Sequence, residues 1–190
     1  MAGIRIISGY AGSLTIRVPG SGTRPTSDRV REALFSALEA RDAMYGAEVL
    51  DLYAGSGSLG LEAASRGAVA VTLVDRSPEA AKVCRGNAKI VSAAAPKSAA
   101  PRVTVHAQAV GAFLANATVP YDLVFVDPPY DLPEAELTAN LAALGPLIAP
   151  DGLLLVERSS RSPEPVIPPE LELLRKSTYG ETLVWWVQPA

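Results

Sequence analysis

Short apolar runs alternate with amphipathic segments along most of this chain. The apolar runs have the length of buried strands and cover residues 49–52, 69–74, 103–106, 121–126 and 152–157. Helical patterns lie between them at 58–66, from Ser77 onward, at 110–116 and at 134–144. Strands that alternate with helices are joined by crossovers, so the pattern predicts an α/β fold with a mostly parallel sheet and helices on both faces.

The beginning of the chain has a different pattern. Runs 4–8 and 14–18 are short and β-like, and Gly9 and Gly12 separate them, which predicts a small N-terminal β-hairpin. A helix is expected over 28–41, where apolar residues form one stripe.

The end of the chain predicts a second hairpin. Runs 171–177 and 182–187 are joined by a turn and are expected to close the sheet, which then has seven strands. We therefore expect two units: a hairpin extension over 1–24 and a main domain over 25–190.

Three segments are predicted to lack strands and helices. Residues 150–152 (Pro-Asp-Gly) have the composition of a turn before the fifth core strand. Residues 92–101 and 162–169 are low in complexity and are expected to be surface loops.

Length and composition exclude several classes of protein. The 190 residues suit one domain with a small appendage, and no apolar stretch reaches the ~18 residues of a membrane span. Cys84 is the only cysteine and His106 the only histidine, which excludes an internal disulfide, a multi-histidine zinc site and, in practice, a Ser-His-Asp triad. We expect a cytoplasmic protein without a metal or a membrane partner, and a monomer.

Positive charge is concentrated near the N-terminus although the net charge is −3. Residues 1–31 hold one acid, Asp28, and five arginines: Arg5, Arg17, Arg24, Arg29 and Arg31. A local basic surface can bind phosphates on an acidic protein, because salt screens charges beyond about 10 Å. The charges alone fit an ordinary solvated face equally well.

The tetrapeptide Asp127-Pro128-Pro129-Tyr130 directly follows the apolar run 121–126. In open α/β sheets, ligands bind at the carboxyl ends of the strands. The prolines stiffen the loop and leave carbonyls free to accept hydrogen bonds, Asp127 supplies another acceptor, and Tyr130 a flat stacking surface. This set is suited to holding a planar base by its amino group; the alternative is a turn that ends the strand.

A glycine loop, Gly55-Ser56-Gly57-Ser58-Leu59-Gly60, follows the first core strand and opens a helix. With Asp75 twenty residues after Gly55, it matches the fingerprint of dinucleotide-binding proteins. Any adenosine-containing cofactor can use this geometry. Asp51, at the end of the preceding strand, favours S-adenosylmethionine, because a carboxylate can meet its ammonium but would repel a pyrophosphate.

Together these motifs resemble a known family. Asp51 to Gly57 with Asp127 to Tyr130 is similar to the amino-methylating class of Rossmann-like methyltransferases. The stretches 5–9 and 23–35 are similar to the bacterial small-subunit (16S) rRNA guanine-N2 methyltransferases, and the resemblance extends from about Arg5 to Val187. It implies methyl transfer from S-adenosylmethionine to the exocyclic N2 amine of a guanine in 16S rRNA, with the small ribosomal subunit or an assembly intermediate as partner.

The resemblance also implies roles for individual residues. Asp127 and the Pro128 carbonyl would hold the amine, with Pro129 shaping the loop and Tyr130 stacking on a flipped base. The cofactor would contact a set of residues at the strand ends: Asp51, Tyr53, Ala54, Gly55, Ser56, Gly57, Asp75, Arg76, Gln108, Ala109 and Asp127. Gln108 stands where many relatives have Asp or Asn. The five arginines would contact rRNA phosphates.

Three alternatives remain open from the sequence. A DNA adenine methylase shares both motifs but usually carries a further target-recognition domain. An RNA-binding assembly factor would keep the fold without turnover. A nicotinamide-dependent oxidoreductase would use the glycine loop but leaves Asp127–Tyr130 without a role.

Overall fold

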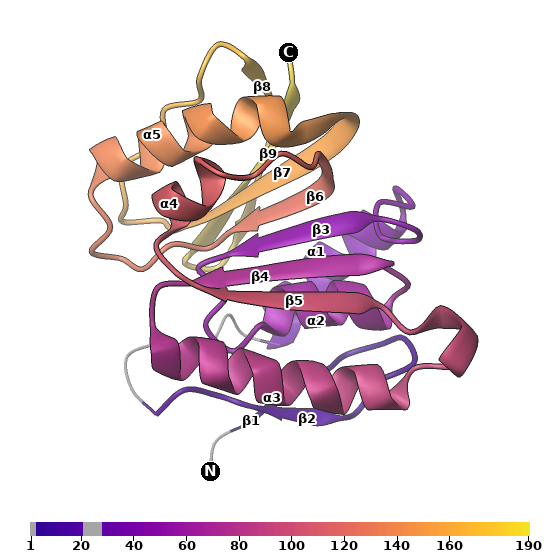
Figure 1. Ribbon diagram of the computed structural model, residues 1–190. Helices are drawn as coiled ribbons and strands as arrows, with labels where there is room; N and C mark the ends of the chain where they lie inside the picture. Colours follow the sequence, from indigo (N-terminus) through magenta and orange to yellow (C-terminus); the bar gives the residue numbers. More distant parts are fainter. Residues whose placement is uncertain (1–2, 21–27) are drawn as a thin grey trace.

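The protein is built around one central sheet (Figure 1). The computed structural model describes residues 3–20 and 28–190, and within them seven strands pair in the order β5-β4-β3-β6-β7-β9-β8. The strands are β3 (Glu48–Leu52), β4 (Ala70–Asp75), β5 (Arg102–Ala107), β6 (Tyr121–Val126), β7 (Ile148–Ser159), β8 (Leu171–Tyr179) and β9 (Thr182–Pro189). Strands β3 to β7 are parallel, and β9 and β8 close the sheet as an antiparallel hairpin.

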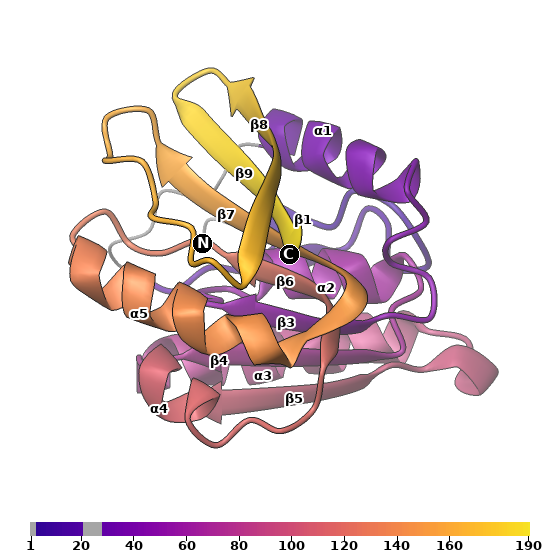
Figure 2. The same cartoon turned by 90° about the horizontal axis from the view of Figure 1, so that it is seen from above.

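Helices cover both faces of this sheet. One face carries α1 (Asp28–Glu39), α2 (Ser58–Ser65) and α3 (Pro78–Ala94), and the other carries α4 (Val110–Leu114) and α5 (Glu134–Leu144). Figure 2 shows α1 and α5 on opposite sides of the strands. The predicted α/β fold with a seven-stranded sheet is confirmed. No described helix is both long enough and apolar enough to span a membrane.

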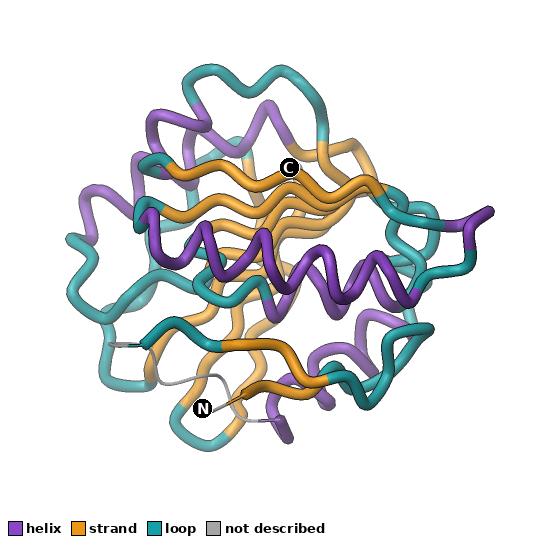
Figure 3. The backbone as a smooth tube through the Cα atoms, turned by 60° about the horizontal axis from the view of Figure 1, so that its bottom comes forward, coloured by secondary structure: helices purple, strands orange, loops and turns teal. Residues whose placement is uncertain are grey.

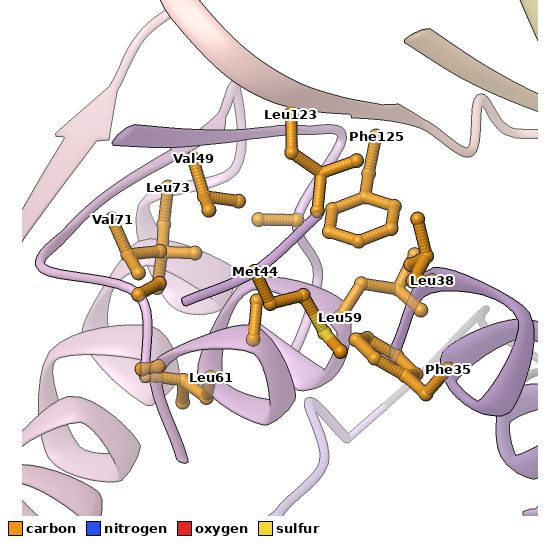
Figure 4. Packing of buried hydrophobic residues seen from close by; sticks show 14 of the residues in the cluster. Phe35, Leu38, Met44, Val49, Leu59, Leu61, Val71, Leu73, Leu123 and Phe125 are labelled. Atoms are coloured by element: carbon orange, nitrogen blue, oxygen red, sulfur yellow. The ribbon is translucent and has the colours of Figure 1, made fainter. Parts of the chain in front are cut away.

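Each face of the sheet has its own apolar core. On the α1–α3 face, Phe35 of α1 packs against Phe125 of β6 with ring centroids 5.7 Å apart, among the aliphatic side chains in Figure 4. On the α4–α5 face, Leu137 and Leu141 pack against Val124 and its neighbours. The central strands are apolar on both sides for this reason, which is why the sequence shows continuous apolar runs.

The N-terminal hairpin packs onto the α1–α3 face. Strands β1 (Gly3–Arg5) and β2 (Thr15–Arg17) are antiparallel, and the paired Ile4 and Ile16 are buried in the core of that face. Figure 3 shows the hairpin alongside α3. The buried carboxylate of Glu62 in α2 accepts hydrogen bonds from the backbone N–H groups of Ile7 and Ser8, at 2.7 and 3.0 Å. The hairpin is thus held by both apolar and polar contacts.

Gly9 allows the hairpin to approach α2. Its φ is 79°, and a Cβ there would lie 1.8 Å from the carbonyl oxygen of Ser65. We expect Gly9→Ala to lower the free energy of unfolding by more than about 2 kcal/mol, because the backbone at position 9 or at Ser65 would have to move to make room for the added Cβ. Gly46→Ala is the control: its φ is 75°, nothing lies within 4 Å, and the loss should be about 1 kcal/mol. Equal losses in chemical denaturation would contradict this explanation.

Two of the segments expected to be irregular are partly regular. Pro150 to Gly152 do not precede β7 but lie within it, at a register shift between the pairs Tyr121–Ile148 and Leu123–Leu153. Such an irregularity admits a proline because ladder hydrogen bonds are interrupted there. In 92–101, α3 continues to Ala94 and a 3-10 turn covers Lys97–Ala99, since alanine favours helix. Residues 162–169 form no strand or helix, as predicted.

Candidate active site

The candidate site lies where the strand order reverses. From β3 the sheet continues in one direction to β4 and β5, and in the other to β6 and β7. At such a point the crossovers diverge to opposite faces and leave a crevice at the carboxyl ends of the strands. Because β3 to β7 are parallel, Asp51, Asp75, Asp127 and Glu157 are all brought to this one edge.

The glycine loop after β3 depends on positive φ angles. Tyr53, Gly55 and Gly57 have φ of 61°, 55° and 77°. The helix that follows lies close to the sheet, since a Cβ on Gly60 would be 2.5 Å from Leu73 Cδ2. The loop therefore presents backbone at the strand end, where a ligand can approach it closely.

Asp75 ties the glycine loop to the end of β4. Its Oδ2 accepts a hydrogen bond from the Gly55 N–H at 2.9 Å, and its Oδ1 accepts one from the Ser77 N–H at 2.8 Å. A carboxylate has about four acceptor positions, so two remain for hydroxyl donors. Arg76 is exposed, and the Gln108 N–H donates to the Asp75 carbonyl at 3.0 Å. Asp75, Arg76 and Gln108 are thus brought together, with the exposed Ala109 next in the chain.

Asp51 lies beneath the loop and is only 1% exposed. Its Oδ2 accepts a hydrogen bond from the Gly60 N–H at 2.9 Å. Burial raises the pKa of Asp51 to about 7, and the nearby Asp75 charge adds to the shift while the Gly60 hydrogen bond opposes it. A cation bound above the loop would favour the ionised form of Asp51.

The Asp127–Tyr130 loop forms the other side of the site. Leu132 N–H donates to the Pro129 carbonyl at 3.1 Å, which fixes a turn and leaves Tyr130 73% exposed. Asp127 is half-buried. Its pKa is raised well above the usual range, mainly by burial and further by the charges of Glu157 and Asp51. One cleft is lined by Asp127, Pro128, Tyr130, Glu157, Arg158, Ser159, Ser162 and Thr182.

Tyr53 differs from the expectation that it faces a cofactor. Its hydroxyl accepts a hydrogen bond from Asn140 Nδ2 of α5 at 2.8 Å, and its ring packs against the core of the α4–α5 face. Burial raises the pKa of Tyr53 to about 12. Only the backbone of Tyr53, with that of Ala54, belongs to the loop.

The arginines predicted to contact RNA divide into different groups. Arg5, Arg17 and Arg29 are exposed, and the hairpin pairing places Arg5 and Arg17 on its outer face. Arg24 lies outside the described residues. The prediction for Arg31 is wrong: its side chain is 0% exposed and donates to Asp28 Oδ1 at 2.7 Å and to the Arg5 carbonyl at 2.8 Å.

Sequence reasoning missed two residues at the site. Glu157 is an acid at the end of an apolar run, and this position could have marked it as a site residue. Its place beside Asp127 depends on the order of the strands, which the sequence does not show. Asn87 of α3 is fully buried: its Oδ1 accepts from the Arg17 N–H, and its Nδ2 donates to the carbonyls of Arg17 and Ser56. It joins the hairpin to the glycine loop, and its place within a helical pattern gave no sign of this.

Comparisons with known proteins agree with this geometry. The family model described as Conserved hypothetical protein 95 matches residues 4–188. Ribosomal RNA small subunit methyltransferase D of Escherichia coli K12 is 36% identical over 94% of this chain and 86% of its own. The protein of the same name from Haemophilus influenzae is 34% identical over 93% of this chain and 89% of its own.

Solved structures show the same architecture. A hypothetical protein of Thermus thermophilus is 31% identical, with a TM-score of 0.81 over 97% of this chain and 99% of that one. Magnesium protoporphyrin IX methyltransferase of Synechocystis PCC 6803, covering 89% of this chain and 87% of that one, has a TM-score of 0.66 at 18% identity and shares the fold alone. With a family model that spans nearly the whole chain and curated relatives above 30% identity, the chain belongs to the Conserved hypothetical protein 95 family, together with the small-subunit rRNA methyltransferases D.

Proposed function

We propose that this protein transfers a methyl group from S-adenosylmethionine to the exocyclic N2 amine of a guanine in 16S rRNA. The observation that carries the proposal is the position of the Asp127–Tyr130 loop. This loop follows β6 and the glycine loop follows β3, the two neighbouring strands at which the strand order reverses. The amine that accepts the methyl group and the cofactor that donates it would therefore meet between the two loops. The rRNA substrate is supported by the relatives named ribosomal RNA small subunit methyltransferase D.

The residues at the ends of β3, β4 and β5 fit the cofactor. Asp75 has acceptor positions left for the ribose hydroxyls, and the glycine loop offers close approach to backbone. Asp51, buried beneath the loop, would attract the ammonium of the methionine moiety through its field or through water rather than by direct contact. When bound, the cofactor supplies an electrophilic methyl on a sulfonium.

The residues after β6 act on the amine. The N2 lone pair of guanine is delocalised into the ring, so the amine is a poor nucleophile. Acceptors at Asp127 and the Pro128 carbonyl would hold its hydrogens and favour a pyramidal nitrogen directed at the methyl. The N2 lone pair would form the new N–C bond as the cofactor's S–C bond breaks, and the electron pair of that S–C bond would stay on sulfur. The surplus proton then leaves N2 for the Asp127 carboxylate.

The RNA would be held outside the crevice. Tyr130 is exposed enough to stack on a base turned out of its strand. Arg5, Arg17 and Arg29 are proposed as phosphate contacts, because each exposed guanidinium can pair with a phosphate. Arg24 is proposed as a further contact from the sequence alone. Arg31 instead serves the structure by tying α1 to β1.

The test is to identify the labelled nucleoside. The protein is incubated with methyl-labelled S-adenosylmethionine and 16S rRNA, either naked or in partly assembled small subunits, and the RNA is then digested. We expect label in N2-methylguanosine. Label in methyladenosine would favour adenine as the target, and no label on any RNA form would overturn the proposal.

A further inference from the structure

Glu157 lies beside Asp127, and the mechanism above gives it no part. Strands β6 and β7 are parallel neighbours with Val126 opposite Val156, so Asp127 and Glu157 are the next pair along. Neighbouring strands lie about 4.8 Å apart, so the two residues leave the sheet side by side.

Their side chains project to the same face. Asp127 is two residues after Phe125, and Glu157 is two residues after Leu155; both apolar residues belong to the core of the α1–α3 face. Because successive side chains along a strand point to opposite faces, each carboxylate lies on the same face of the sheet as the apolar residue two positions before it. Consistent with this, both line the cleft that Tyr130 borders.

Two carboxylates that face one cleft present adjacent hydrogen-bond acceptors to whatever the cleft holds. Burial and the Glu157 charge together raise the pKa of Asp127, as expected when two like charges lie close together. A ligand with two adjacent N–H donors would pair with both carboxylates and reduce the repulsion between them.

We propose that Glu157 accepts a hydrogen bond from N1–H of the target guanine while Asp127 accepts one from N2–H, which makes Glu157 a specificity-determining residue. The inference rests on the proposed function, since it takes guanine N2 as the methyl acceptor. Adenine carries an unprotonated N1, whose lone pair would face the Glu157 carboxylate. Such a base is disfavoured because acceptor meets acceptor.

The experiment changes N1 of the base, together with its C6 substituent, while keeping the 2-amino group. Once the labelled guanosine has been located, RNA is prepared with either guanine or 2,6-diaminopurine at that position; the latter has an N1 acceptor in place of N1–H and a 6-amino group in place of the 6-oxo group. Wild-type protein should prefer guanine by roughly ten- to a hundredfold in kcat/KM. In Glu157→Gln the amide can donate to N1 of diaminopurine, so the preference should fall at least about tenfold.

Three further measurements make the outcome decisive. Glu157→Asp keeps a carboxylate and should retain the preference for guanine at a lower rate. Glu170→Gln, an exposed position, should behave as wild type. If wild-type protein methylates both RNAs equally, or if Glu157→Gln folds and keeps the full preference, the role of Glu157 is refuted. Label on guanine RNA in those same assays would leave the proposed function standing.

Discussion

Replacing Asp127 by alanine is expected to slow methyl transfer by at least about a thousandfold while leaving the affinity for S-adenosylmethionine nearly unchanged. The residue lies after β6, across the crevice from the glycine loop, and supplies the carboxylate that the proposed mechanism needs at the amine. Single-turnover rates with saturating cofactor isolate the chemical step, and calorimetry measures cofactor binding. Asp131→Ala, an exposed acid four residues later, is the matched control and should keep the wild-type rate.

The pH dependence gives a second readout of the same residue. Burial, with the Glu157 and Asp51 charges, raises the pKa of Asp127. The ionised carboxylate is the acceptor, so the wild-type rate should fall as pH falls through this raised pKa. Asp127→Asn removes the titrating group and should lose that part of the profile. Wild-type turnover in Asp127→Ala would refute the catalytic role.

Asp51→Asn is expected to stabilise the free protein above neutral pH and to weaken cofactor binding. Burial raises the folded-state pKa of Asp51 to about 7 from an ordinary value of 3.8. Between these two pH values the folded state holds a proton that the unfolded state has lost, so wild-type stability decreases as pH rises through this window. The difference amounts to at most about 4 kcal/mol, at about 1.4 kcal/mol per pH unit.

The two effects of Asp51→Asn can be measured separately. Denaturation of wild type and variant at pH 5, 7 and 8.5 should give curves that diverge with rising pH, with the variant more stable at the top. Cofactor affinity at pH 8 should fall by roughly ten- to a hundredfold, because a buried charge near the ammonium is lost. Parallel stability curves would show that Asp51 does not titrate as proposed, and unchanged affinity would remove its role toward the cofactor.

Arg31 was wrongly predicted to contact RNA because it lies in a cluster of arginines in the sequence. It precedes Leu34, Phe35 and Leu38 by three, four and seven residues, so it lies on the apolar stripe of α1. The sequence pattern therefore contained the signal, but the cluster of arginines around it favoured a phosphate contact. Burial became acceptable only because Asp28 and the Arg5 carbonyl, from another element, satisfy the guanidinium in part.

Tyr53 and Glu157 show a different limit. Tyr53 lies two residues before Gly55 of the glycine loop, yet its side chain turns to Asn140, which is 87 residues away in the chain. Glu157 lies 30 residues from Asp127 and shares no motif with it, but adjacent strand ends bring the two carboxylates together. Neither contact leaves a local pattern, because each depends on which strands and helices become neighbours.

Local chemistry alone determined the elements and the two loops of the site. Apolar runs that are buried on both faces, positive-φ glycines and stiff prolines are properties of short segments, so the α/β fold and the positions of Gly55–Gly57 and Asp127–Tyr130 were evident from the sequence. Tertiary structure decided which side chains share the crevice: Asp51 beneath the loop, Asp75 on Gly55 and Glu157 beside Asp127. The physical reason is the order of parallel strands, which long-range packing selects and which no single segment encodes.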